Sequence, residues 1–369
     1  MNTPRISNIQ VFWITFSIEC AMTLFFTQSP VIQTAKQDAW ISYLVGGAIA
    51  CGITLLSRAL SLMYPEQSLN DFSTKILGSW FGKILVVPFL LIWIVMSGSL
   101  LRQFSDFFQM ILFDRTPTSV LMLLMMVIVV SLVWAGGIEG IGRCSQLMGP
   151  VILLIIVAIT LLSFNNYELE QIFPIFSDSG ARAIMRGSLA PASVLGDTVF
   201  LLMVTKFMEN PRQGTKFAVW AVASVAIISS VLTLTALSIF GSALASKMLF
   251  PTFEMMRYVS LMEFIQNIEI FSSVLWFFSV FLKLSLYLFI ACYGMSQWMG
   301  LKRWSISVWV ISPAVYIIAW IFPKTVLYTS QIQLHLSVRY VMPIELIGIP
   351  FLMWMIGKVR KRRSHPKKL

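Results

Sequence analysis

The sequence predicts an all-α integral membrane protein of about ten transmembrane helices. Of its 369 residues, 57% are hydrophobic and only 12% are charged, and the mean hydropathy is +0.82. A soluble domain carries about 25% charged residues, so this chain lacks the polar surface to cover itself in water. Many of its 12 tryptophans stand at the ends of apolar runs, as expected of rings that lie at the membrane interface.

Apolar runs of about 20 residues, long enough to cross a bilayer, recur along the chain. The predicted spans are 8–32, 40–63, 81–108, 118–136, 146–164, 184–207, 216–241, 270–299, 304–322 and 338–357. We predict a single transmembrane domain over residues 1–357 and a basic tail over 358–369. An even number of spans places both termini on one side of the membrane.

Lysine and arginine indicate which side is cytoplasmic, because loops rich in them stay inside. With the N-terminus inside, 17 of the 27 lie on inner segments and nine on outer ones, Arg102 among them. Seven inner charges belong to the tail: Lys358, Arg360, Lys361, Arg362, Arg363, Lys367 and Lys368. Beside a membrane, such a run favours anionic lipid at about 1 kcal/mol per charge, and we expect no nucleic-acid partner. Both termini are therefore predicted to be cytoplasmic.

Two long connections fall on the predicted outer side, at residues 165–183 and 242–269. The second contains an amphipathic stretch from Met255 to Ile268, in which apolar residues recur every three or four positions. This pattern predicts a helix on the outer surface. The helix could simply pack on the bundle, or it could close an outer vestibule.

Three ionisable residues stand out inside predicted spans, because a charge at membrane depth is costly unless it is paired or lines a cavity. Glu19 is in the middle of the first span, Asp197 in the middle of the sixth, and Lys283 in the eighth. Each is a candidate ligand-binding residue. Lys283 could pair with either carboxylate, or it could take the place of a coupling cation. Pairing is favoured, because an isolated buried ammonium tends to lose its proton.

The sixth span has the features of a broken helix. Pro191 removes a backbone donor and Gly196 weakens the helix, while Ser193 can satisfy freed groups. A break at mid-depth exposes N–H and C=O groups that can hold a ligand. The alternative is a kinked helix without a ligand.

The first span has small and polar residues at a similar depth. The predicted ligand-binding set is therefore Glu19, Cys20, Ala21, Thr23, Ser193, Gly196, Asp197 and Lys283. We expect no catalytic residues, cofactor or metal. The histidines, His335 and His365, fall in a predicted outer loop and the tail, and the four cysteines have no C-x-x-C spacing.

Several short segments, taken in order, carry a distinctive pattern. They are Ala35-Lys36-Gln37-Asp38-Ala39-Trp40, Asp114-Arg115-Thr116-Pro117, Gly137-Ile138-Glu139-Gly140, Gly196-Asp197, Phe250-Pro251-Thr252 and 281–301. Together they resemble the spore-germination permease family, the B subunits of bacterial germinant receptors, within the amino acid–polyamine–organocation superfamily. The likeness runs nearly end to end.

The resemblance implies two inverted five-helix repeats, in which broken helices one and six form a central site completed by helices three and eight. It implies an amino acid or similar small nutrient as germinant, a membrane A subunit and a lipoprotein C subunit as partners, and the spore inner membrane as location. The family's usual glycine in the first break is absent, since Glu19 to Met22 stand there. Glu19 would repel an anion if charged, so the ligand could be cationic, or Lys283 could satisfy Glu19.

Three functions remain open. The favoured one is a sensor, in which the ligand biases two conformations that a partner subunit detects. The second is an active permease for an amino acid or amine. The third is a scaffold with a vestigial site, held together by buried ion pairs.

Overall fold

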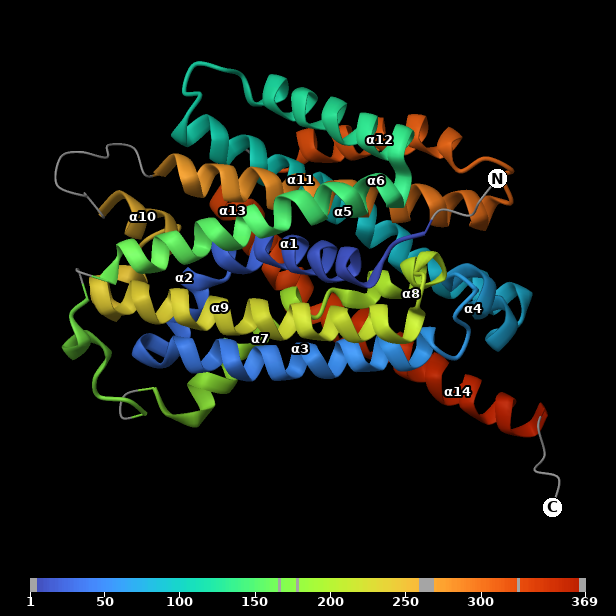
Figure 1. The fold of residues 1–369 in the computed structure, drawn as a ribbon, viewed down its shortest axis with the longest axis horizontal. Helices are drawn as coiled ribbons and strands as arrows, with labels where there is room; N and C mark the ends of the chain where they lie inside the picture. Colours follow the sequence, from blue (N-terminus) through green and yellow to red (C-terminus); the bar gives the residue numbers. More distant parts are fainter. Residues whose placement is uncertain (1–4, 165–166, 177–178, 259–268, 324–325, 365–369) are drawn as a thin grey trace.

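The computed structural model describes residues 5–164, 167–176, 179–258, 269–323 and 326–364, and the regular elements there are helices (Figure 1). The α-helices are α1 (Asn8–Phe26), α2 (Gln28–Ala35), α3 (Ala39–Ser61), α4 (Leu69–Leu77), α5 (Ser79–Ile111), α6 (Thr118–Leu162), α7 (Gly180–Leu195), α8 (Leu201–Val204), α9 (Pro211–Ala245), α10 (Pro251–Tyr258), α11 (Glu269–Met299), α12 (Ser305–Ile321), α13 (Val326–Leu336) and α14 (Ile349–Ser364). Short 3-10 helices are η1 (Lys36–Asp38), η3 (Leu169–Ile172), η4 (Thr198–Phe200) and η5 (Thr205–Phe207), and η6 (Ser337–Gly348) is a π-helix.

Ten membrane crossings can be traced through the described residues. Eight helical segments are long and apolar enough to span a bilayer, and α12 is a shorter apolar helix. The 45-residue α6 supplies two of the crossings, because the chain folds back at Gly137, where φ is 51° (Figure 1). Glycine tolerates this positive φ, which other residues rarely adopt. The predicted all-α membrane fold of about ten helices is confirmed.

The two ends of the bundle differ in what they carry. Both chain termini lie at one end, which we call the terminal face, and α10 lies at the other, which we call the α10 face (Figure 1). The helix expected over Met255–Ile268 begins earlier, at Pro251, and residues 259–268 lie outside the described residues. The basic tail starts inside α14, which continues to Ser364.

The sixth crossing is broken close to the predicted position. Helix α7 ends at Leu195, and Gly196 and Asp197 connect it to η4. In the first crossing the interruption lies at Thr27, four residues beyond Thr23. Helix α1 contains neither glycine nor proline, so nothing in its own sequence breaks it earlier. The predicted residues Glu19 to Thr23 therefore lie in an intact helix.

Arg102 does not lie in an outer connection, as the charge count assumed. It is buried within α5, which continues nine residues further to Ile111. His335 is likewise in a helix, α13, and not in a loop. The side chains of α5 stay buried beyond Arg102 as far as Phe108, whereas most of the described side chains of α13 are exposed.

The contact between α3 and α9 depends on Gly47. A Cβ atom at this position would lie only 2.3 Å from Cβ of Ala226 on α9. We expect Gly47→Ala to destabilise the fold by about 1–3 kcal/mol, the usual cost of overpacking. Gly52→Ala, on the same helix but with open space around it, should be neutral or stabilising by up to about 1 kcal/mol. Unfolding of both variants in one detergent tests this, and equal stabilities would contradict it.

Candidate functional site

A buried ion pair lies at the break of the sixth crossing. Nζ of Lys283 on α11 is 3.4 Å from Oδ2 of Asp197, and their side chains are only 3% and 20% exposed. Lys283 also lies 5.3 Å from the ring centroid of Tyr287, one turn along α11. The break thus positions a carboxylate from one crossing against an ammonium from another.

Two further carboxyl groups lie near this pair. Glu19 is fully buried, neither of its carboxyl oxygens has a hydrogen-bond partner among the described residues, and it interacts electrostatically with both Lys283 and Asp197. Glu345, in the π-helix η6, is also buried and interacts with Asp197. Glu19 thus faces both members of the pair, and Glu345 faces Asp197. Among the described residues these carboxyl groups form no cluster with metal-binding geometry.

A small cavity adjoins the ion pair. Its volume is about 30 Å³, and Ser193, Asp197 and Lys283 line it. This is room for about one water molecule, and ligand pockets usually measure about 300–1,000 Å³. The structure therefore shows a closed conformation of this region, in which the cavity is too small for a ligand of ordinary size.

The other predicted residues lie around the cavity without lining it. Cys20, Ala21 and Thr23 are fully buried in α1. Gly196 is a packing position, because a Cβ atom there would lie 2.7 Å from the carbonyl oxygen of Ala192. Three of the eight predicted residues thus share the cavity wall, and Glu19 reaches the pair electrostatically.

Sequence reasoning missed four polar residues of this region. Tyr287, Gln333 and Ser337 line the cavity, and Glu345 lies beside Asp197. Glu345 falls inside the predicted tenth span, so the rule that selected Glu19 also selects it. Gln333 was missed because the helix that carries it begins earlier than the predicted span.

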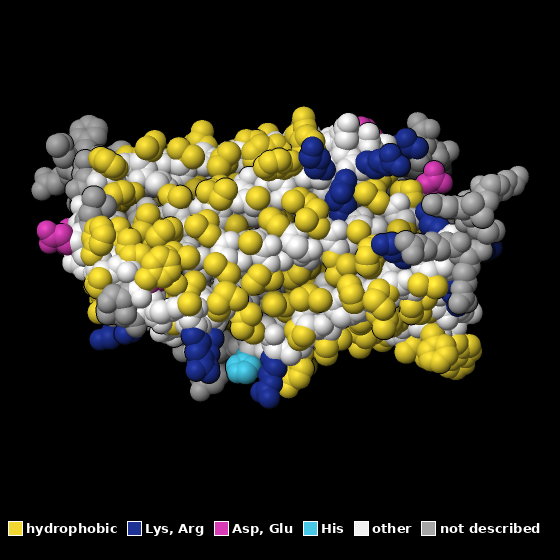
Figure 2. Space-filling view, turned by 90° about the horizontal axis from the view of Figure 1, so that it is seen from below, with side chains coloured by type: hydrophobic (Ala, Val, Ile, Leu, Met, Phe, Trp, Pro, Cys, Tyr) yellow, Lys and Arg dark blue, Asp and Glu magenta, His cyan; other side chains and the backbone are white. Residues whose placement is uncertain are grey.

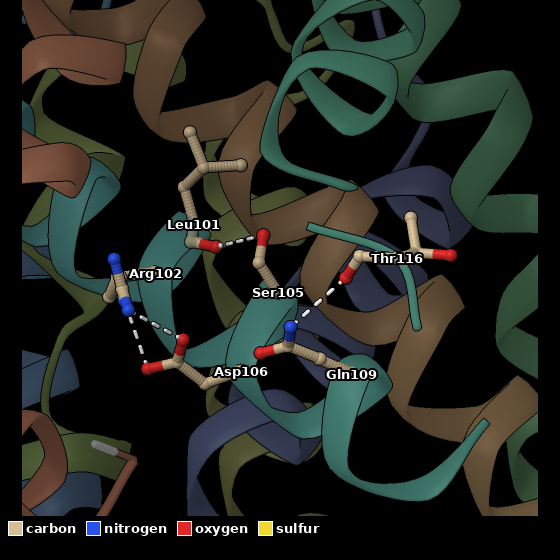
Figure 3. Close-up of polar contacts among 6 residues, drawn as sticks. All are labelled: Leu101, Arg102, Ser105, Asp106, Gln109 and Thr116. Atoms are coloured by element: carbon tan, nitrogen blue, oxygen red, sulfur yellow. Dashed lines mark hydrogen bonds and ion pairs between the residues drawn. The ribbon is translucent and has the colours of Figure 1, made fainter. Parts of the chain in front are cut away.

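A row of polar side chains on α5 continues from the cavity toward the α10 face. Ser99 donates a hydrogen bond to Gln333 at 2.7 Å, and Gln103 contacts both of these residues. Arg102, about one turn after Ser99 on α5, forms a bidentate ion pair with Asp106, at 2.9 and 3.0 Å (Figure 3). Ser105 donates to the carbonyl of Leu101, and Gln109 to that of Thr116 (Figure 3).

The site is closed toward the α10 face by aromatic rings. Phe25 packs against Trp276 with centroids 4.6 Å apart, and Phe107 packs against Phe250 at 5.3 Å. Gln28, directly after the break at Thr27, fixes the start of α10, because its Oε1 accepts bonds from N and Oγ1 of Thr252 at 3.1 and 2.6 Å. Helix α10 therefore packs over the bundle at this face.

The site is also closed toward the terminal face. Residues 5–7 run beside the end of the sixth crossing, where the amide of Ile6 donates to the carbonyl of Phe207 at 2.8 Å. The amide of Glu209 donates to the carbonyl of Ile6 at 3.0 Å. Lys206 donates to the hydroxyl of Tyr293 on α11. The cavity is thus occluded from both sides of the bundle.

We expect Gln28→Leu to release α10. The substitution leaves the amide of Thr252 without its acceptor, and a lost buried hydrogen bond costs about 1–3 kcal/mol. Amide hydrogen exchange should become faster in residues 252–258. Gln33→Leu, which loses a bond to the carbonyl of Ser246 near the surface, is the matched control. Unchanged exchange in α10 of the Gln28 variant would contradict the assigned role.

Comparison with known proteins is consistent with this geometry. A family model described as "Spore germination protein" matches residues 5–326. Among curated relatives from Bacillus subtilis (strain 168), spore germination protein YndE is 24% identical over 234 residues, which cover 61% of each chain. Spore germination protein KB is 21% identical, over 71% of this chain and 70% of its own. The alignment with YndE thus spans about three-fifths of that relative.

Solved structures show the fold. Mhp1, a nucleobase-cation-symport-1 family transporter in a closed conformation with bromovinylhydantoin bound, has a TM-score of 0.69 at 11% identity, over 98% of this chain and 92% of its own. MhsT in complex with L-phenylalanine has a TM-score of 0.61 at 13% identity, over 97% of this chain and all of its own. The expected transporter-like fold is confirmed. Because the family model matches most of its length, the chain belongs to the spore germination protein family.

Proposed function

We propose that this chain is the germinant-recognising membrane subunit of a spore germinant receptor. Family membership supports a role in germination, and the transporter-like fold supports a central ligand site. The observation that carries the proposal is the buried pair of Asp197 and Lys283, held at a helix break beside an occluded cavity. Buried charges at membrane depth are costly and are typical of ligand or ion sites.

The ligand is a small nutrient, an amino acid or a similar molecule, that carries an ammonium group. Glu19 and Asp197 offer carboxyl groups to such a group. Among the described residues, Glu19 in particular has no hydrogen-bond partner in this closed conformation. A cationic group in the enlarged cavity supplies that partner.

Signalling follows from two conformations of the bundle. The closed cavity holds about one water molecule, so a nutrient binds an expanded state and shifts the population toward it. The shift is limited by the difference between the ligand's affinities for the two states. The sixth crossing is broken at the site and the first at Thr27, toward the α10 face, so the movement of their halves is the signal that other subunits receive.

The same proposal extends to partners and location. We place the chain in the spore inner membrane with both termini cytoplasmic, beside a membrane A subunit and a lipoprotein C subunit. The basic end of α14, with Lys358 and Arg360 exposed, faces anionic lipid on the cytoplasmic side.

Germination of spores that carry Asp197→Ala tests the function. We expect the variant to need at least tenfold more germinant, because a charge-assisted bond contributes about 1.5–3 kcal/mol. The Asp197→Asn/Lys283→Met double variant, which removes both charges of the pair, serves as a second variant with the same expected loss. An unchanged dose response in both variants would falsify the site. Uptake of labelled amino acid by the reconstituted wild-type chain alone supports the permease instead.

A further inference from the structure

A second cavity lies between α2, α7, α13 and the π-helix η6. We call it the flank cavity. Its volume is about 410 Å³, much larger than that of the central cavity. Its charged lining is basic, with Arg186 from α7 and His335 and Arg339 from the tenth crossing. Leu189 and Val338 provide apolar walls.

The two arginines have no negative partner within the protein. Among the residues that the structure describes, neither Arg186 nor Arg339 forms an ion pair, and both side chains are exposed. Arg339 lies 5.8 Å from the ring centroid of Tyr340. Two guanidinium groups that share one cavity repel each other unless an anion lies between them.

The flank cavity opens on the part of the surface that faces the bilayer. Arg186 precedes Asp197 by eleven residues, about 16 Å of helix, and the hydrocarbon half-thickness is about 15 Å. With the helix break near the membrane centre, Arg186 is at headgroup level toward the α10 face. Figure 2 shows a flank covered largely by hydrophobic side chains, where dark-blue basic side chains flank a cyan histidine.

We infer that the flank cavity binds the headgroup of an anionic phospholipid. Arg186 and Arg339 bind the phosphate oxygens, since the planar guanidinium fork suits phosphate, and the acyl chains lie along Leu189 and Val338. A phospholipid fits both the two arginines and the apolar walls, because it brings negative charge to headgroup level and apolar chains below it. The cavity is formed by the tenth crossing and by α2 and α7, the halves of the first and sixth crossings nearer the α10 face. Bound lipid therefore holds these elements together.

Thermal unfolding of the purified full chain tests this site in nanodiscs of phosphatidylcholine with and without phosphatidylglycerol. Phosphatidylglycerol should raise the Tm of the wild type. The Arg186→Gln/Arg339→Gln variant should bind the anionic lipid at least tenfold more weakly, at about 1 kcal/mol per charge. The matched control is Arg115→Gln/Arg257→Gln, which removes two exposed charges outside the flank cavity.

Three outcomes overturn the inference. The first is an equal lipid effect in the wild type and the Arg186→Gln/Arg339→Gln variant. The second is the same arginine-dependent stabilisation by soluble inorganic phosphate in phosphatidylcholine nanodiscs, which identifies a free-anion site. The third is no lipid effect on the isolated chain together with arginine-dependent assembly of the receptor, which identifies an acidic protein partner.

Discussion

Lys283→Met should destabilise the chain by about 3–5 kcal/mol, the usual cost of removing one partner from a buried ion pair. Lys283 is 3% exposed and lies 3.4 Å from Asp197. It is also the ammonium that faces Glu19, whose oxygens have no hydrogen-bond partner among the described residues. Its removal leaves two buried carboxyl groups without a cation. Thermal or denaturant unfolding in a fixed detergent measures the loss.

A double variant separates the loss of the pair from the loss of packing. Asp197→Asn/Lys283→Met removes both charges at nearly unchanged volume, so it should recover much of the stability that Lys283→Met loses. If the single variant is as stable as the wild type, the pair does not neutralise a buried charge. If the double variant is no more stable than the single one, the lysine acts through packing alone.

Arg102→Met is the second substitution with a large expected effect, again about 3–5 kcal/mol. Arg102 is 2% exposed, Asp106 is 8% exposed, and two bonds of 2.9 and 3.0 Å join them (Figure 3). The substitution leaves the carboxylate of Asp106 buried without its cation. Arg102→Met/Asp106→Leu should be close to the wild type in stability, since apolar replacement of both partners is often neutral.

Another pair one turn apart on a helix provides the matched control. Arg143 and Glu139 are also four residues apart, but their side chains are 77% and 39% exposed and their closest atoms are 3.8 Å apart. Arg143→Met should cost no more than about 1 kcal/mol, as for other exposed pairs. Equal costs for the Arg102 and Arg143 variants would contradict the role of burial.

The architecture could be predicted because the bilayer imposes strong length and charge rules. The apolar runs predicted the crossings, and Pro191 and Gly196 predicted the break in the sixth crossing. The break at Thr27 was not predicted, although Pro30 favours it. Pro30 lies three residues later and has no backbone N–H to donate to the carbonyl of Phe26. There, Oγ1 of Thr27 bonds to the carbonyl of Thr23 and to the hydroxyl of Tyr43, each at 2.6 Å. The bond to Tyr43 joins α1 to α3, and a contact between two helices cannot be read from the sequence pattern of one of them.

The site could be predicted only in part, for a related reason. Asp197 and Lys283 stood out as charges within apolar runs, and the structure brings them into contact. That Glu345 joins them follows from the path of the tenth crossing, which the sequence does not specify. Arg102 was counted among the outer charges although the predicted span 81–108 contains it, and α5 continues beyond it to Ile111.

Ligand binding by the purified chain tests the central claim most directly. The measurement is the Tm of the wild type, Asp197→Asn and Asp197→Asn/Lys283→Met, titrated with a panel of amino acids and small amines. We predict that at least one ligand with an ammonium group stabilises the wild type, and that both variants need at least tenfold more of it. If both variants bind that ligand as tightly as the wild type, the cavity beside Asp197 is not the germinant site.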